Sequence, residues 1–176
     1  MSCTELQTLD FLSVNALLGA YGLELIEVDV GSSIPASYWG EPEAGLAGKC
    51  IFARPDTPFH SLLHETAHYV CMSAKRRLTL WRNAGGSTEE ENAVCFLQVL
   101  LADYLPGFGR QKLLSDMNEW GYTFREGDAN AWFHGDGRSA REWLLTMGII
   151  DIKERPTWRL RGAVSNKVPT RDIEFF

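Results

Sequence analysis

Residues 64 to 68 read His64-Glu65-Thr66-Ala67-His68, and this pentapeptide carries most of the chemistry that the sequence suggests. Two histidines four apart on a helix lie on one face, so both imidazoles can bind one metal ion. Zn²⁺ accepts neutral imidazole nitrogens in a tetrahedral site that keeps one position for water. Glu65 lies to the side, where it can take a proton from that water. The pattern predicts a catalytic zinc site with His64 and His68 as metal ligands and Glu65 as general base.

The residues around the pentapeptide favour a helix that has a metal-binding face. The segment 59–72 contains no Gly or Pro, and Pro58 stands just before it, where a helix start tolerates proline. Apolar residues gather beside the histidines, namely Leu63, Ala67, Val70 and Cys71. The competing interpretation is that both histidines are hydrogen-bonded residues at the edge of the core. His60, one turn before His64, is expected at the helix start or along a cleft rather than as a ligand.

A third metal ligand is expected from the next helix, over residues 88–105, which begins with Glu89, Glu90 and Glu91. Acidic residues are favoured at helix starts even without a metal, so their presence does not identify the ligand. The angular position of each glutamate around the helix has to distinguish the three. At about 100° per residue, Glu90 falls near the middle of the apolar face and Glu91 on its outer side. A carboxylate directed at the core is costly unless it is paired or binds metal. Phase therefore predicts Glu90 as the ligand and Glu91 as the alternative; further candidates are Asp103, His134 and Asp136.

The composition limits the number of domains and the kinds of partner that the sequence allows. A chain of 176 residues, 45% of them hydrophobic, suits one domain with its own core. The net charge of −6 disfavours nucleic-acid binding overall, and no apolar run is long enough to span a membrane. The N-terminus lacks a recognisable secretory signal. Four cysteines without paired spacing favour free thiols in a reducing, cytoplasmic compartment.

The pattern of elements predicts an α+β fold, mainly helical, with a small sheet packed on the histidine-bearing helix. Helices are expected over residues 4–20, 59–74, 88–105, 109–120 and 140–148, and strands over residues 23–30 and 49–54. Loops are expected over residues 31–48 and 121–138, and the single domain 1–176 is expected to end in an extended segment, 151–176. The strand 49–54 directly precedes the metal helix, so it could be an exposed edge that pairs with a peptide; an internal strand is the alternative.

The run from Ile51 to Pro106 resembles the ImmA/IrrE-type metallopeptidase family. A short strand, a Pro-containing turn and a Phe precede the His-Glu-x-x-His pentapeptide, and a Glu-x-x-Ala-x-x-Phe helix from Glu90 follows. The resemblance implies a minimal zincin fold in which His64, His68 and Glu90 hold Zn²⁺ and Glu65 is catalytic. The chain departs from the family at residues 66–67, where Thr-Ala stands in place of Leu-Gly, and residues 107–176 match none of its motifs.

We therefore expect a zinc-dependent peptidase that hydrolyses peptide bonds of a protein substrate. The oxyanion that forms needs a further donor, for which His134, Tyr104 and Tyr122 are candidates. His134 is preferred because glycines 135 and 137 flank it in an expected cleft loop. Two alternatives come from other classes: a zinc-binding regulatory or interaction module with little or no peptidase activity, and a toxin–antitoxin or DNA-maintenance component. The expected partner is a protein or peptide substrate, with a regulatory protein as a further candidate.

Overall fold

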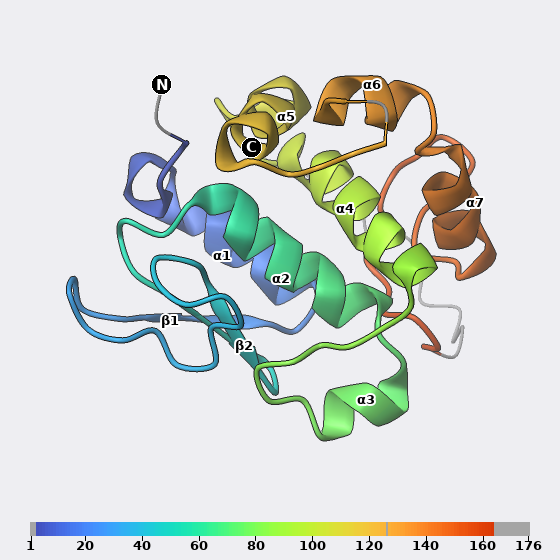
Figure 1. The fold of residues 1–176 in the computed structure, drawn as a ribbon. Coiled ribbons are helices and arrows are strands. Elements are labelled where there is room, and N and C mark those ends of the chain that lie inside the picture. The colour runs from blue at the N-terminus through green and yellow to red at the C-terminus, as the bar shows by residue number, and fades with distance from the viewer. Residues whose placement is uncertain (1–2, 126, 164–176) are drawn as a thin grey trace.

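The computed structural model of this protein describes residues 3–125 and 127–163. In this part of the chain, seven α-helices accompany a three-stranded mixed sheet that packs against α2, which confirms the expected α+β fold (Figure 1). The helices are α1 (Phe11–Ala20), α2 (Phe59–Cys71), α3 (Ala74–Leu78), α4 (Thr88–Ala102), α5 (Gly109–Trp120), α6 (Ala129–His134) and α7 (Arg138–Thr146), and a 3₁₀ turn spans Leu6–Thr8. The strands are β1 (Glu24–Glu27), β2 (Gly45–Ala47) and β3 (Cys50–Ala53).

Helix α2 lies at the centre of the molecule, and every one of its residues except His64 is buried. Its apolar side chains are continuous with those of α4, which packs across it; Leu63, Val70, Leu97 and Leu100 are all buried in one core cluster. Burial of such side chains stabilises the fold by about 1.5–3 kcal/mol each. The same packing fixes the position of the two helices that carry the candidate metal ligands, because both share one closely packed core.

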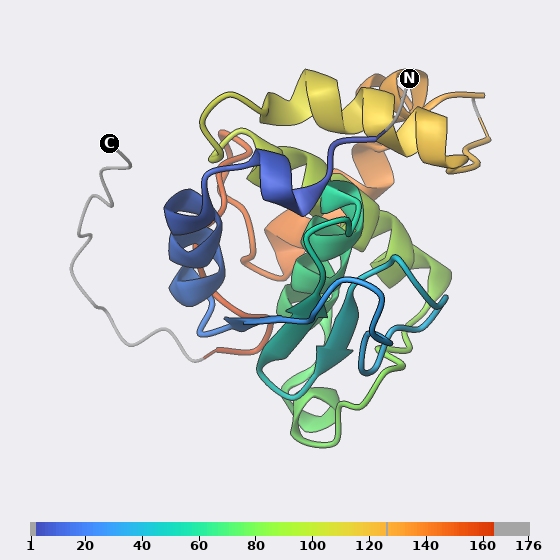
Figure 2. The ribbon, with the colours of Figure 1, turned by 90° about the vertical axis from the view of Figure 1, so that its left-hand side faces the viewer.

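The sheet has the strand order β1-β3-β2, with β1 parallel and β2 antiparallel to β3. Figure 2 shows the strands beneath α2. Strand β3 pairs on both sides, so residues 49–54 form the internal strand that was one of the two interpretations, and not an exposed edge. The two edges of the sheet are β1 and β2. Residues 80–82 already hydrogen-bond to part of β2: the Arg82 N–H donates to the Leu46 carbonyl, 3.0 Å away. Strand β2 was not predicted because three residues are too few to show an alternating pattern.

Several boundaries also differ from the expectation. The helix expected over residues 4–20 is split, since the Asp10 side chain accepts a hydrogen bond from Ser13 N and caps a new helix there. Helix α6 occupies a segment expected to be a loop, and α3 extends past the end of the helix expected over residues 59–74, where no helix was predicted. Helix α7 begins after Gly137. The C-terminal segment packs on the body at least as far as Arg161, whose N–H donates to the Val70 carbonyl at 2.9 Å; residues 164–176 lie outside the described part of the chain. None of the described helices has the length and hydropathy that a bilayer crossing requires.

Gly45 offers a test of how the loop before β2 is packed. A Cβ built at this glycine would lie 1.8 Å from the Pro35 carbonyl oxygen. The Gly45→Ala variant should therefore lose about 1–3 kcal/mol of unfolding free energy, because the loop backbone has to move. Gly19→Ala is the matched control: its Cβ meets nothing within 4 Å inside α1, so it should be neutral or stabilising by about 0.5–1 kcal/mol. Chemical denaturation measures both; equal stabilities would contradict the packing described.

Candidate metal centre

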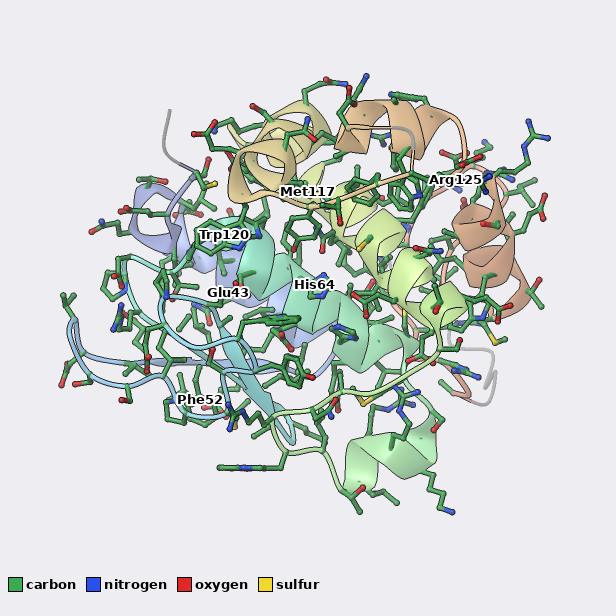
Figure 3. The ribbon with its side chains drawn as sticks, viewed as in Figure 1. Glu43, Phe52, His64, Met117, Trp120 and Arg125 are labelled. Carbon is green, nitrogen blue, oxygen red and sulfur yellow. The ribbon has the colours of Figure 1, made fainter. Side chains whose placement is uncertain are left out.

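Helix α2 presents His64 and His68 on the same face, one turn apart. Their ring centroids are 4.6 Å apart and the rings are perpendicular. Figure 3 shows His64 near the middle of α2. Burial, together with the charge of neighbouring His64, lowers the pKa of His68 to about 3, so this imidazole is neutral near pH 7. A neutral imidazole is the form that binds a metal ion. The pKa of His64 is instead raised, because the lowering effect of burial is outweighed by Tyr122, Cys95 and Glu91. This imidazole therefore has to release a proton when it binds a metal ion.

Glu91 is the acidic residue that the structure brings to these two imidazoles. His64 Nε2 lies 3.3 Å from Glu91 Oε1, and His68 Nε2 lies 3.4 Å from Glu91 Oε2. One ligand atom from each of the three residues falls within 4.8 Å of the others. Among the described residues this is the group of histidine and carboxylate side chains that could hold a metal ion.

The spacing of these atoms fits ligands of one ion. Two ligand atoms that each lie about 2.0–2.1 Å from a tetrahedral zinc are separated by about 3.3–3.4 Å. A direct charge-assisted hydrogen bond between nitrogen and oxygen would instead be about 2.7–2.9 Å long. The two distances from Glu91, one to each of its carboxylate oxygens, lie near the first value and exceed the second. The three residues therefore could hold one metal ion between them.

Glu90, which helical phase favoured as the third ligand, is turned away from the histidines. Its position is as expected, since only 4% of the residue is exposed. Its partners, however, are two arginines: Arg76 donates to both carboxylate oxygens at 2.5 and 2.9 Å, and Arg161 donates to Oε2 at 2.9 Å. This is a correction of the sequence-based assignment. A buried carboxylate needs a compensating charge, and here the charge comes from α3 and the C-terminal segment.

Gln98 contacts His64 at Nδ1, the ring nitrogen that does not face Glu91. Gln98 Oε1 lies 2.7 Å from His64 Nδ1, and the glutamine is fully buried in α4. When Nδ1 carries the proton and donates to Oε1, the Nε2 lone pair faces the metal position. Sequence reasoning missed this role, although Gln98 follows Glu91 by seven residues and so shares its helix face. The corresponding Nδ1 of His68 has no hydrogen-bond partner among the described residues.

We predict that Gln98→Leu lowers zinc affinity about 10- to 100-fold, because His64 loses the acceptor that selects its tautomer. Gln98→Glu retains an acceptor and should recover most of the affinity. Competition titration with a fluorescent chelator measures both. Val99→Ala serves as the control for a general loosening of α4, since Val99 is fully buried at the next position. An unaltered affinity of the Leu variant would refute the role of Gln98.

Glu65 lies beside the group, on the next residue of α2 after His64. It lines the same cleft as the histidines and is 7% exposed. Burial raises its pKa to about 7, with a smaller raising effect from Glu43 and Glu91 and a lowering effect from His64. A carboxyl group with a pKa near neutrality is suited to accept and return a proton.

The metal group opens into a cleft of about 360 Å³. One wall comes from the loop before β2 and the other from the segment between α3 and α4. The lining residues are Tyr38, Trp39, His64, Glu65, His68, Arg82, Asn83, Ala84, Gly85, Gly86, Ser87, Thr88 and Glu91. This cleft gives the candidate metal position access to solvent and to a ligand.

A second set of polar and aromatic side chains adjoins His64 toward the N-terminal end of α2. Trp120 Nε1 donates to Glu43 Oε1 at 3.1 Å, and both residues lie near that end of the helix in Figure 3. His60 is buried between Trp120 and Tyr122, and its Nδ1 lies 3.4 Å from the Tyr122 hydroxyl. His60 thus stands at the helix start, as expected, but within the core rather than along the cleft.

The three candidates for an oxyanion donor are placed very differently. His134 ends α6 as an exposed residue against Phe133, and it is absent from the lining of the cleft. Tyr104 packs against Trp158. The ring of Tyr122 lies 6.1 Å from that of His64, centroid to centroid. Among the three, Tyr122 is the one whose ring contacts that of His64, although Tyr122, like His134, is not among the residues that line the cleft. Asp103 and Asp136 do not belong to that group either; Asp103 pairs with Arg110.

Comparison with known proteins found no relative of this chain. The chain matches no protein-family model, and it has no significant match among curated proteins or solved structures. The geometry of the site therefore carries the functional argument.

Proposed function

We propose that this protein is a zinc-dependent peptidase related in its chemistry to the ImmA/IrrE-type metallopeptidases. The observation that supports it best is the placement of Glu91 between the Nε2 atoms of His64 and His68, with Glu65 next to them in an open cleft. Two imidazoles and one carboxylate are the protein ligands typical of catalytic zinc in hydrolases, which leaves one position open.

Zinc is the metal that this ligand set favours, because it takes nitrogen and oxygen ligands in a tetrahedral site of low coordination number. When bound there, the ion would act as a Lewis acid toward water and the scissile carbonyl. The third ligand of this proposal is Glu91, one position after the residue that the family resemblance implied. His64, held by Gln98, and His68 supply the other two nitrogens.

Glu65 is the proposed general base and acid. Its carboxylate takes a proton from the attacking water and delivers it to the leaving amine. Tyr122 is the candidate donor to the oxyanion, because its ring lies 6.1 Å from that of His64. Its hydroxyl is protonated at neutral pH, and burial raises its pKa further, to about 12. The four free cysteines are in keeping with the proposed cytoplasmic location, where thiols stay reduced.

The direct test is hydrolysis of a mixed peptide library by the purified, zinc-loaded chain, read by mass spectrometry. We expect cleavage that a chelator stops and that added zinc restores. Stoichiometric zinc binding without any cleavage, also in the presence of proteins captured from cell extract, would favour the alternative of a metal-binding regulatory module. The DNA-maintenance alternative gains no support from the described C-terminal arginines 155 and 161, which pair with Asp151 and Glu90.

A further inference from the structure

Two aromatic side chains stand exposed on one wall of the cleft. Tyr38 is 46% exposed and Trp39 is 75% exposed, and their rings meet edge to face with centroids 5.0 Å apart. Both line the same cavity as the metal group. Large aromatic surfaces are the usual anchors of a bound partner, because covering them releases much apolar area from water.

The loop that carries these rings is well anchored, so they are held at the cleft rather than free to turn into the core. The Glu41 carboxylate accepts the Ile34 N–H at 3.0 Å, and Ser37 Oγ accepts the Gly40 N–H at 3.1 Å. Ile34 is itself 5% exposed. The absence of a side chain at Gly45 lets this loop lie directly on β2. A wall fixed in this way loses little conformational entropy when a ligand binds.

The opposite wall is made of small residues and main chain, from Ala84 to Ser87. Arg76 fixes it by donating to the Ala84 carbonyl at 2.7 Å and to the Gly85 carbonyl at 3.1 Å, while it also pairs with Glu90. A Cβ at Gly86 would approach Glu90 Oε1 to 2.9 Å, so this stretch stays close to the helix behind it. One wall thus offers aromatic rings, and the other leaves room for a peptide main chain.

We infer that Tyr38 and Trp39 bind an apolar, preferably aromatic, side chain of an extended peptide, next to the bond held at the metal group. This inference rests on the proposed peptidase function and names its substrate class. Ala84 to Ser87 lie along the substrate main chain. An acidic substrate side chain is disfavoured here, because Glu65 and Glu91 line the same space. Arg82 is the cation among the lining residues, so an acidic side chain is the competing ligand that the test must include.

Binding of peptide hydroxamates to the zinc-loaded protein tests the inference without any turnover. Three compounds that differ in one side chain beside the hydroxamate, Phe, Ala or Asp, are compared by calorimetry. We expect the Phe compound to bind about 3- to 10-fold more tightly than the Ala compound, and the Asp compound to bind most weakly. In Trp39→Ala the advantage of Phe over Ala should disappear, while zinc affinity stays unaltered.

Trp81→Ala is the matched control, because Trp81 is 66% exposed on the neighbouring segment but does not line the cleft. It should keep the full preference for Phe. Equal binding of all three compounds, or tightest binding of Asp, would overturn the aromatic subsite and leave the metal site intact. If zinc binds but no hydroxamate does, the proposed peptidase site itself fails, so the two failures can be told apart.

Discussion

Replacing Glu91 with alanine should remove zinc from the protein. Even outer partners of a metal site contribute about 10- to 100-fold to affinity, so the loss of a direct ligand should exceed about 100-fold. The reason is geometric: Glu91 offers one carboxylate oxygen to each imidazole, at 3.3 and 3.4 Å. Elemental analysis should give about one zinc per wild-type chain and almost none for Glu91→Ala, and chelator competition gives the ratio of affinities.

Glu90→Gln is the control that separates the two neighbouring glutamates. It should still bind one zinc per chain, but it should unfold more easily by roughly 2–4 kcal/mol, because Arg76 and Arg161 lose a buried counter-charge. Both arginines are partly exposed, at 33% and 28% of their side chains, which keeps the cost below that of a fully enclosed pair. A Glu90 variant that loses zinc while Glu91→Ala retains it would reverse the assignment.

Replacing Glu65 with glutamine should abolish most peptide hydrolysis while zinc stays bound. Glutamine has nearly the same shape but cannot accept the proton of the attacking water, and a positioned general base contributes about 10²- to 10⁴-fold to the rate. The measurement is kcat/KM on a substrate from the peptide library, with zinc content determined on the same samples. Cleavage by the Gln variant at the wild-type rate would exclude this mechanism.

The pH dependence of the proposed peptide hydrolysis by the wild-type protein should follow from the same residue. The base is active when deprotonated, so kcat/KM should fall as the pH drops below the pKa of Glu65. Burial and the neighbouring glutamates raise this pKa to about 7 in the metal-free protein, and a bound dication lowers it. The acid limb is therefore expected below pH 7, and the limb should be absent from the residual activity of Glu65→Gln.

The sequence by itself determined the centre of the site. The spacing of His64 and His68 places both imidazoles on one face of any helix that contains them, whatever the rest of the fold does. The absence of Gly and Pro from that segment, and the acidic start of the next helix, predicted α2 and α4 closely. The sequence also indicated that an acidic residue should be the third ligand and should come from the first turn of α4, because three glutamates stand there.

Only the tertiary structure decided which glutamate faces the histidines. Phase correctly placed Glu90 in the interior, but burial does not identify a metal ligand: the interior carboxylate is neutralised by arginines that lie 14 and 71 residues away in the sequence. A catalytic metal also needs contact with solvent. The candidate ligand Glu91 fits this requirement, because it lies at the border of the core and its side chain is 49% exposed.

The walls of the cleft depended on long-range packing as well. Strand β2, the loop carrying Tyr38 and Trp39, and the segment 80–87 become neighbours through contacts that leave no local periodic pattern. His134 was preferred as a donor because glycines flank it, but local chain flexibility says nothing about distance from the metal group. Tyr122 is near His64 because α5 packs over α2, and such an approach of distant helices is decided by how whole apolar faces fit together.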